Sequence, residues 1–325
     1  MDFFKRQKLL ISVFLLIMLI AVVHLYPDYK IKQKYNDDWA MYNYGQSIDG
    51  EAGKAGIDLN ILPVLELKHD YKEVLVAVVD TGVDTESEIL QNRMMSGWDF
   101  YNRDDSVYDN YIHDYHGTYV STTIAKIAPN AKILPVKFME SSYGSIEDAV
   151  LSIRYAIENG ARIINCSWNF NDYDEDLFNI IKDNPDILFV SAAGNSNTNI
   201  DKSPLYPSSY ELENIINVMA INNNGKIHNT SGYGVKTVDI AAPGVGVKVI
   251  LPENDITYID GTSVAAASVS ATAALLLSED SSLSPKEIIE IINSSARKID
   301  SLEHLSKSGG YLDVYTSIID YLKSE

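Results

Sequence analysis

Short apolar runs alternate with stretches of helical spacing along the chain from about residue 37 to its end. Five continuous apolar runs predict buried strands, namely EVLVAVVD (73–80), KILPVKF (132–138), RIINCSW (162–168), DILFVSAAG (186–194) and NIINVMAI (214–221). Apolar residues at helical spacing predict helices over residues 116–128, 145–160 and 284–299. This alternation is typical of an α/β domain with a mainly parallel central sheet flanked by helices on both faces.

Two of the predicted helices carry signals for their ends. Ser284, with Glu287 three residues later, predicts a capping box at the start of the helix over 284–299. Gly160 predicts the end of the helix over 145–160, because glycine tolerates the left-handed backbone that closes many helices.

The first 27 residues follow a different pattern. No Asp, Glu, Lys or Arg lies between Lys8 and Asp28, and a helix over 9–27 would be about 28 Å long, close to the hydrocarbon thickness of a bilayer. The end of the run lacks the small residues of a cleavage site, so we expect an uncleaved transmembrane anchor, with a buried core helix as the alternative. Lysines flank both ends, so the positive-inside rule does not set the orientation by itself. The expected organisation is a cytoplasmic tail (1–8), a signal anchor (9–27), a tether (28–36) and an extracytoplasmic catalytic domain (37–325).

The net charge and the cysteine count limit the kinds of partner and metal site that the protein can have. The chain has 325 residues, of which 46% are hydrophobic, and its formal net charge is −19. Such a negative field repels phosphate backbones, so we expect no nucleic-acid partner. Cys166 is the single cysteine, which excludes an internal disulfide and a cysteine-based zinc site. We expect no disulfide-linked partner, and we expect Cys166 to pack in the core.

Four polar residues stand where predicted strands end or helices begin. Asp80 ends the first strand, Asn195 follows the fourth, His116 begins a helix, and Ser263 precedes a run of small and apolar residues. Three of them have simpler readings: Asp80 as a turn aspartate, His116 as an exposed loop histidine and Ser263 as an N-cap serine. Functional residues of parallel α/β sheets collect at the carboxyl ends of strands, so the four together indicate one site.

The segments around these residues resemble the subtilisin-like serine peptidases. The order Asp80, His116, Ser263 is the order of that family, in the contexts VAVVDTGVD, HGTYV and DGTSVAAASV. The resemblance extends to INCSW, SAAGNS, YPSSY, AAPGVGV and GGYLDVYTSI, and the segment beginning WAMYNYG resembles the opening of convertase-like members. It covers nearly the whole chain from about residue 37.

The resemblance implies a serine endopeptidase. Ser263 would be the nucleophile, His116 its general base, and Asp80 the group that orients the imidazole. Asn195 would donate its side-chain amide to the oxyanion, together with the backbone N–H of Ser263. The chain departs from the family near the site, with Val264, Ala267 and Ser268 where Met, Pro and His are usual, and Tyr119 where His is usual. A catalytically weak or inactive subtilisin fold that binds a partner is therefore the alternative.

The resemblance also assigns substrate-binding residues. Ser167, Trp168 and Asn169 would pair with the substrate backbone, and Asn169 stands where the family usually has Gly, which narrows the mouth of the specificity pocket. Asp172 aligns with acidic residues that select Lys or Arg in convertase-like members. The alternative for Asp172 and its acidic neighbours is a solvated loop.

No cofactor is required for this chemistry, and no metal ligands are assigned. The segment TESEIL, after Asp84, lacks a common calcium ligand of the family, which leaves structural calcium elsewhere as an open expectation. The expected partners are a peptide or protein substrate and, through the anchor, a membrane.

Overall fold

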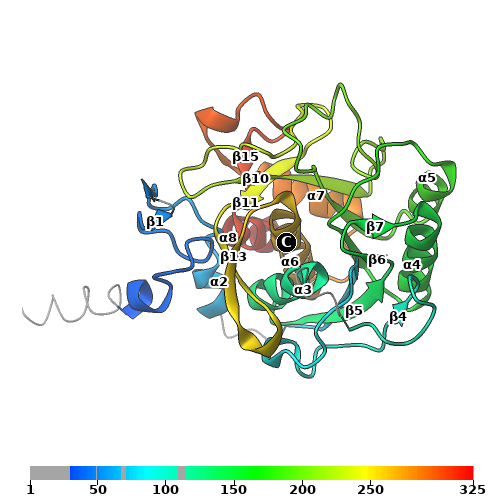
Figure 1. Cartoon of the computed structure of the whole chain (residues 1–325). Helices are drawn as coiled ribbons and strands as arrows, with labels where there is room; N and C mark the ends of the chain where they lie inside the picture. The colour runs from blue at the N-terminus through cyan, green and yellow to red at the C-terminus, as the bar shows by residue number, and fades with distance from the viewer. Residues whose placement is uncertain (1–29, 49, 67–70, 109–114, 325) are drawn as a thin grey trace, which may run out of the picture.

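The structure is a computed structural model that describes residues 30–48, 50–66, 71–108 and 115–324. The predicted tail and anchor lie outside the described residues. Within these ranges the strands of one sheet follow the order β14-β15-β11-β10-β9-β8-β3-β5-β4, and only the edge pair β14 and β15 is antiparallel (Figure 1). Their bounds are β3 (Val74–Asp80), β4 (Trp98–Asp99), β5 (Ala131–Lys137), β8 (Ile163–Cys166), β9 (Leu188–Ala192), β10 (Ile215–Ile221), β11 (Ile240–Pro243), β14 (Arg297–Lys298) and β15 (Gly310–Tyr311). The mainly parallel sheet is confirmed.

Helices cover both faces of this sheet, as the sequence predicts. Alternate residues of β3 show the division: Val76 and Val78 pack in the core with α3, α6, α7 and α8, whereas Ala77 and Val79 pack with α4 and α5 on the opposite face. The helices are α2 (Leu62–Glu66), α3 (His116–Ile127), α4 (Ile146–Glu158), α5 (Glu175–Lys182), α6 (Thr262–Glu279), α7 (Pro285–Ser294) and α8 (Val314–Ser324).

Three small antiparallel hairpins and three short 3-10 helices complete the described fold. The hairpins are β1 (Ser47–Ile48) with β2 (Glu51–Ala52), β6 (Met139–Glu140) with β7 (Tyr143–Gly144), and β12 (Val247–Ile250) with β13 (Ile256–Ile259). The 3-10 helices are η1 (Glu88–Leu90), η2 (Pro252–Asn254) and η3 (Asp300–Leu302). The β12–β13 hairpin lies against α3, where Lys126 Nζ donates to the Lys248 carbonyl at 2.8 Å (Figure 1).

The predicted helix ends are confirmed in two places and wrong in a third. Gly160 follows α4 with φ +82°, and Ser284 forms the complete capping box with Glu287 at the start of α7. The helix predicted over 284–299 ends at Ser294 instead. The cause is tertiary: Arg297 pairs with Tyr311 in the β14–β15 ladder and places its guanidinium on the Asp313 carboxylate.

Helix α6 runs through the centre of the molecule (Figure 1). It is the one helix in the described part of the chain that is long and apolar enough to cross a membrane, but 94% of that span is buried inside the protein, as in a core helix. Small residues at Ala265, Ala266 and Ala267 let it pack closely against the sheet and α3. The run of small and apolar residues after Ser263 thus forms a buried helix.

Truncating a leucine of α6 is expected to destabilise the whole domain. Leu276 is 0% exposed, so Leu276→Ala leaves a cavity and should lower the free energy of unfolding by about 2–5 kcal/mol. Leu322→Ala is the matched control, because that side chain is 44% exposed and its loss should change stability by no more than about 0.5 kcal/mol. Urea denaturation compares the two, and equal losses would contradict a core position for α6.

Candidate active site

Three side chains from distant segments form a hydrogen-bonded chain at the carboxyl edge of the sheet. His116 Nδ1 lies 2.6 Å from Asp80 Oδ1, and His116 Nε2 lies 2.9 Å from Ser263 Oγ. Asp80 is the last residue of β3, His116 the first of α3, and Ser263 lies in the first turn of α6. The structure therefore brings together the three residues that the sequence assigned to catalysis.

Close backbone contact between β3 and α3 lets the imidazole reach the carboxylate. A Cβ on Gly117 would lie 2.1 Å from the Gly82 carbonyl oxygen and 3.1 Å from Asp80 Cβ, so only glycine allows the two segments to approach this closely. The Gly117 N–H donates to Thr81 Oγ1 at 2.9 Å, which fixes the start of α3 beside the strand end. No local sequence signal identified Thr81 as part of this support.

Asp80 is fully buried, and its two oxygens differ. Oδ1 accepts hydrogen bonds from His116 Nδ1 and from the Thr81 N–H at 2.8 Å, whereas Oδ2 has no hydrogen-bond partner among the described residues. Burial, together with the Asp80 charge, raises the pKa of the Cys166 thiol well above its ordinary value. Cys166 is fully buried and stays protonated, which supports its predicted place in the core.

The hydroxyl of Ser263 is held from two sides. Besides the imidazole, the Ser167 carbonyl oxygen lies 3.3 Å from Ser263 Oγ. Beneath it, Ser270 Oγ donates to Asn165 Oδ1, Asn165 Nδ2 donates to Ser167 Oγ, and Ser167 Oγ donates to the Ser263 carbonyl. This buried network connects α6 to the end of β8. Contacts with both elements therefore hold the nucleophile in place.

Tyr119 packs against the imidazole from the next turn of α3. Its ring lies 4.9 Å from the His116 ring, centroid to centroid, in an edge-on arrangement with an interplanar angle of 62°. This is the position where the resemblance leads one to expect another histidine. The substitution keeps an aromatic wall beside the base, and it removes none of the three catalytic side chains.

Asn195 follows β9 and faces the start of α6. Its Oδ1 accepts hydrogen bonds from the Thr262 N–H at 3.0 Å and from Thr262 Oγ1 at 3.1 Å, which assigns the oxygen and directs Nδ2 away from the helix. Backbone N–H groups in the first turn of a helix, such as that of Ser263, have no intrahelical acceptor. Thr262, which sequence analysis missed, therefore orients the Asn195 side chain at the start of α6.

Two substitutions at Asn195 separate its donor from its positioning contacts. Asn195→Leu is expected to lower kcat by about a hundredfold to a thousandfold with little change in KM, a magnitude measured on subtilisin itself. Asn195→Asp keeps an oxygen for both Thr262 bonds but replaces the amide donor, so it should lose at least as much. Steady-state kinetics on one peptide substrate tests both. An active aspartate variant would mean that Asn195 only holds Thr262.

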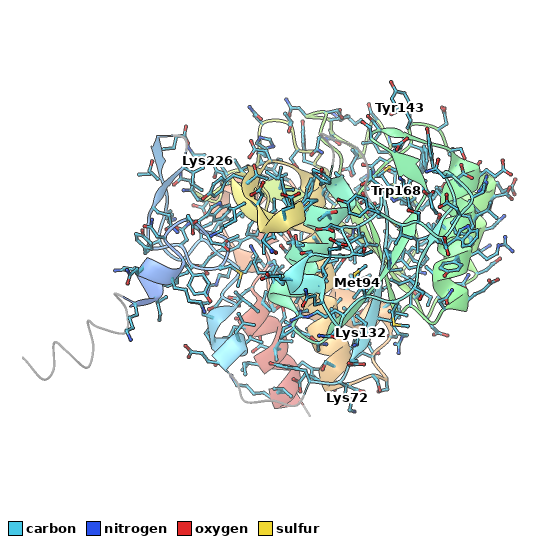
Figure 2. All side chains as sticks on the ribbon, turned by 60° about the horizontal axis from the view of Figure 1, so that its bottom comes forward. Lys72, Met94, Lys132, Tyr143, Trp168 and Lys226 are labelled. Carbon is cyan, nitrogen blue, oxygen red and sulfur yellow. The ribbon has the colours of Figure 1, made fainter. Side chains whose placement is uncertain are left out.

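The segment after β8 forms one wall of a cavity of about 330 Å³ beside His116. The predicted substrate-binding residues Ser167, Trp168 and Asn169 all line it, and the β6–β7 hairpin lines it opposite. Trp168 is set inward, with its Nε1 donating to the Val79 carbonyl at 2.7 Å, while Tyr143 of the hairpin projects outward from the surface and is 76% exposed (Figure 2).

Asp172 is not brought into this cavity. It is exposed and lies in the turn between the Phe170–Tyr206 bridge and α5. Its acidic neighbours belong to the helix, because Asp174 Oδ1 caps α5 by accepting from the Leu177 N–H at 2.8 Å. The geometry thus favours the alternative for this segment, a solvated acidic turn that leads into a helix, and selection of basic residues by Asp172 stays a prediction.

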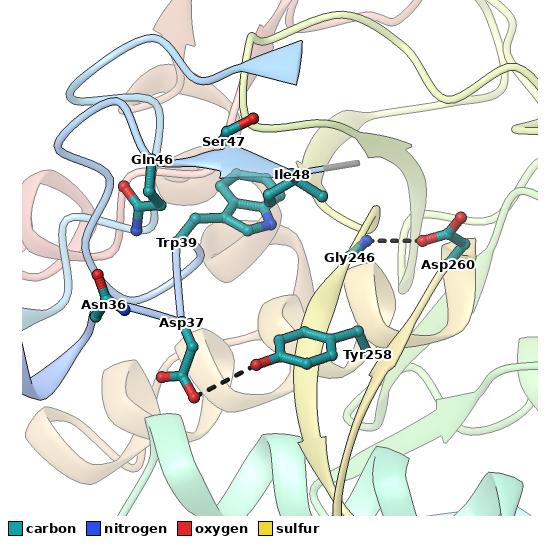
Figure 3. A pocket seen from close by; sticks show the side chains of 9 residues that line it. All are labelled: Asn36, Asp37, Trp39, Gln46, Ser47, Ile48, Gly246, Tyr258 and Asp260. Atoms are coloured by element: carbon teal, nitrogen blue, oxygen red, sulfur yellow. Dashed lines mark hydrogen bonds between the residues drawn. The ribbon is translucent and has the colours of Figure 1, made fainter. Parts of the chain in front are cut away.

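A second cavity, of about 450 Å³, lies between residues 36–48 and the β12–β13 hairpin (Figure 3). There Asp37 Oδ2 accepts from Lys248 Nζ at 2.8 Å and from the Tyr258 hydroxyl at 3.3 Å. Burial alone would raise the pKa of Asp37, but the Lys248 hydrogen bond and charge lower it below its ordinary value. This ion pair anchors the first described segment to the hairpin that precedes Ser263, a contact that the sequence did not predict.

Metal binding gains no support from the described residues, which contain no cluster of three or more His, Cys, Asp or Glu side chains placed to hold an ion. The expectation of structural calcium stays untested.

Comparison with known proteins decides the family. The model of the subtilase family, Peptidase_S8, matches residues 71–311, which include Asp80, His116 and Ser263. The chain belongs to the subtilase family. This subtilase is 30% identical over 296 residues to a cell wall-associated protease of Bacillus subtilis (strain 168), covering 87% of this chain and 32% of that protein.

Two further relatives have comparable identity. A thermophilic serine proteinase of Bacillus sp. (strain AK1) is 33% identical over 247 residues, covering 72% of this chain and 59% of that protein. Thermitase of Thermoactinomyces vulgaris is 32% identical over 234 residues, covering 69% of this chain and 81% of thermitase. This subtilase therefore spans 32% and 59% of the length of the first two relatives.

Solved structures show the same fold. A cold adapted subtilisin-like serine proteinase superposes with a TM-score of 0.66 at 26% identity, covering 79% of this chain and 94% of the other. A protease from Pseudoalteromonas arctica PAMC 21717 superposes with a TM-score of 0.73, covering 88% and 97%, but at 23% identity its likeness is one of fold alone. The resemblance stated from the sequence is confirmed at the level of family and fold.

Proposed function

We propose that this subtilase is a serine endopeptidase that hydrolyses peptide bonds of peptides or proteins. One observation carries the proposal: His116 bridges a fully buried carboxylate and a serine hydroxyl, at 2.6 Å and 2.9 Å respectively. A neutral imidazole placed between a carboxylate and an alcohol is the arrangement that activates a serine nucleophile. The serine proteinases among its relatives support the same activity.

The proposed mechanism follows from the roles that each atom can take. Asp80 accepts the Nδ1 proton of His116, which leaves Nε2 as an acceptor for the hydroxyl proton of Ser263. Ser263 Oγ attacks the substrate carbonyl, and His116 returns the proton to the leaving amine, so an acyl-enzyme forms. A water molecule then attacks the acyl-enzyme, with His116 again acting as base, and the carboxylic acid product leaves Ser263. In both halves Asn195 Nδ2 and the Ser263 N–H would bind the oxyanion.

We also propose that the peptidase domain is tethered to a membrane outside the cytoplasm. The support is the uncharged run over residues 9–27, followed by a short tether before the described body begins. A tethered enzyme would act on secreted peptides or surface proteins near its own membrane. Cleavage after Lys or Arg, predicted from Asp172, is the competing expectation for the substrate of this proposed peptidase.

Labelling of intact cells and membranes tests activity and location together. A fluorophosphonate that does not cross membranes should label the full-length protein in the membrane fraction of intact cells, and Ser263→Ala should abolish labelling. Labelling only after lysis would contradict the extracytoplasmic location, and labelling only in the soluble fraction would contradict the tether. A folded wild-type protein that never reacts would favour the alternative, an inactive subtilisin fold that binds a partner.

A further inference from the structure

Two side chains crowd Gly194, which lies after β9 in the loop that carries Asn195. A Cβ on Gly194 would lie 2.6 Å from Leu205 Cδ1 and 3.3 Å from Asn169 Oδ1. Leu205 and Asn169 therefore both contact the backbone of the loop that carries Asn195. Such contacts leave little room between the segment 167–169 and that loop.

Two hydrogen bonds hold the Asn169 side chain in this position. Its Nδ2 donates to the Ala192 carbonyl at 3.0 Å and to Ser208 Oγ at 2.7 Å. Ser208 Oγ itself donates to the same carbonyl at 2.8 Å and is bonded to Ser191 Oγ. Swinging Asn169 out of the space would break two hydrogen bonds in a buried polar network, so a substrate does not displace it without cost.

The proposed chemistry sets where the attacked residue of a substrate lies. Attack by Ser263 puts the substrate carbonyl carbon next to Oγ and its oxygen toward Asn195. The substrate backbone then passes Ser167, whose carbonyl oxygen lies 3.3 Å from Ser263 Oγ. We place the side chain of the attacked residue between 167–169 and the loop that carries Asn195, because Ser167 contacts Ser263 and Asn195 contacts Thr262.

We infer that Asn169 and Leu205 together restrict cleavage to bonds that follow a small residue: glycine, alanine or serine. The inference rests on the proposed peptidase activity and names the substrate class of that same site. It differs from the Lys or Arg preference predicted from Asp172, because a long side chain would have to enter a space that is already occupied. Specificity would then come from exclusion by these two side chains.

Peptide aldehydes that protect Ser263 from fluorophosphonate labelling test the inference without requiring turnover. Four aldehydes with the same preceding residues and a terminal Ala, Leu, Phe or Lys are compared by the concentration that halves the labelling rate. The Ala aldehyde is expected to protect at a concentration at least about tenfold lower than the other three. Equal or better protection by the Leu, Phe or Lys aldehyde overturns the inference, and best protection by Lys would favour Asp172 instead.

Two variants identify the residues responsible. Leu205→Ala and Asn169→Gly should each improve protection by the Leu and Phe aldehydes at least about tenfold relative to protection by the Ala aldehyde. Asn169→Gly leaves the Ala192 carbonyl bonded to Ser208 Oγ, so it creates no unpaired acceptor. Leu305→Ala is the matched control, since Leu305 is partly buried in the same hydrophobic cluster but lies in the loop after η3.

The outcomes separate this inference from the proposed function. Wild-type protein that is never labelled overturns both. Wild-type protein that is labelled but not protected by the Ala aldehyde overturns the restriction alone. If Leu205→Ala and Asn169→Gly are both still labelled and both keep the wild-type preference among the four aldehydes, the restriction to small residues is also overturned.

Discussion

Replacing Ser263 with alanine is expected to lower kcat by about a millionfold, a magnitude measured on subtilisin itself. The hydroxyl is the atom that bonds to the substrate, and it lies 2.9 Å from His116 Nε2, the base that would take its proton. The fold should be retained, because alanine suits the first turn of α6. Hydrolysis of one fluorogenic peptide, measured against its uncatalysed rate, gives the loss.

Ser268→Ala is the matched control for this substitution. Ser268 lies in the same helix, is equally inaccessible, and its hydroxyl donates to the Val264 carbonyl at 3.1 Å. That carbonyl keeps its helical partner, so activity and folding should both be preserved. Substantial activity in Ser263→Ala would mean that another group attacks the substrate, and equal loss in both variants would point to damage of α6 rather than removal of a nucleophile.

The layers of the fold could be predicted because burial imposes a regular pattern on the chain. Every residue of β10 is buried, and β3 sends alternate residues to opposite faces, so both read as continuous apolar runs. The β12–β13 hairpin has no such pattern, because Ile256 and Tyr258 are exposed apolar residues on its outer face. Helix α5 was missed since its first turn is acidic and its buried face consists of little more than Leu177 and Ile181.

The site could be predicted only as a set of residues. Asp80, His116 and Asn195 stand at the ends of recognisable elements, and the family resemblance supplied their roles. The contacts that orient them join segments far apart in sequence: Thr262 and Asn195 are 67 residues apart, and Ser167 and Ser263 are 96 apart. Such pairs leave no local signal. The same reason explains why Leu205 could not be predicted to share a space with Asn169.

Replacing Asp80 with asparagine is expected to lower kcat about ten-thousandfold, a loss known for the equivalent change in a serine peptidase of another fold. Asp80 Oδ1 accepts from both His116 Nδ1 and the Thr81 N–H. An asparagine that keeps its oxygen there places an NH₂ group at the position of Oδ2, which is buried and has no hydrogen-bond partner among the described residues. An asparagine turned the other way points NH₂ at Nδ1 and selects the wrong tautomer of His116.

Both orientations remove the negative charge that stabilises the imidazolium formed during attack, so the loss does not depend on which one is adopted. Asp84→Asn is the matched control. Asp84 is 3% exposed in the same strand-end loop, and its Oδ1 accepts from the Glu86 N–H at 3.0 Å, a bond that an asparagine oxygen can keep. Parallel measurements of kcat and of urea stability compare the two variants. Of these two aspartates, Asp80 is the one that contacts the imidazole. An equal loss of activity in Asp84→Asn would therefore mean that the structure of the loop, and not the buried carboxylate, controls His116.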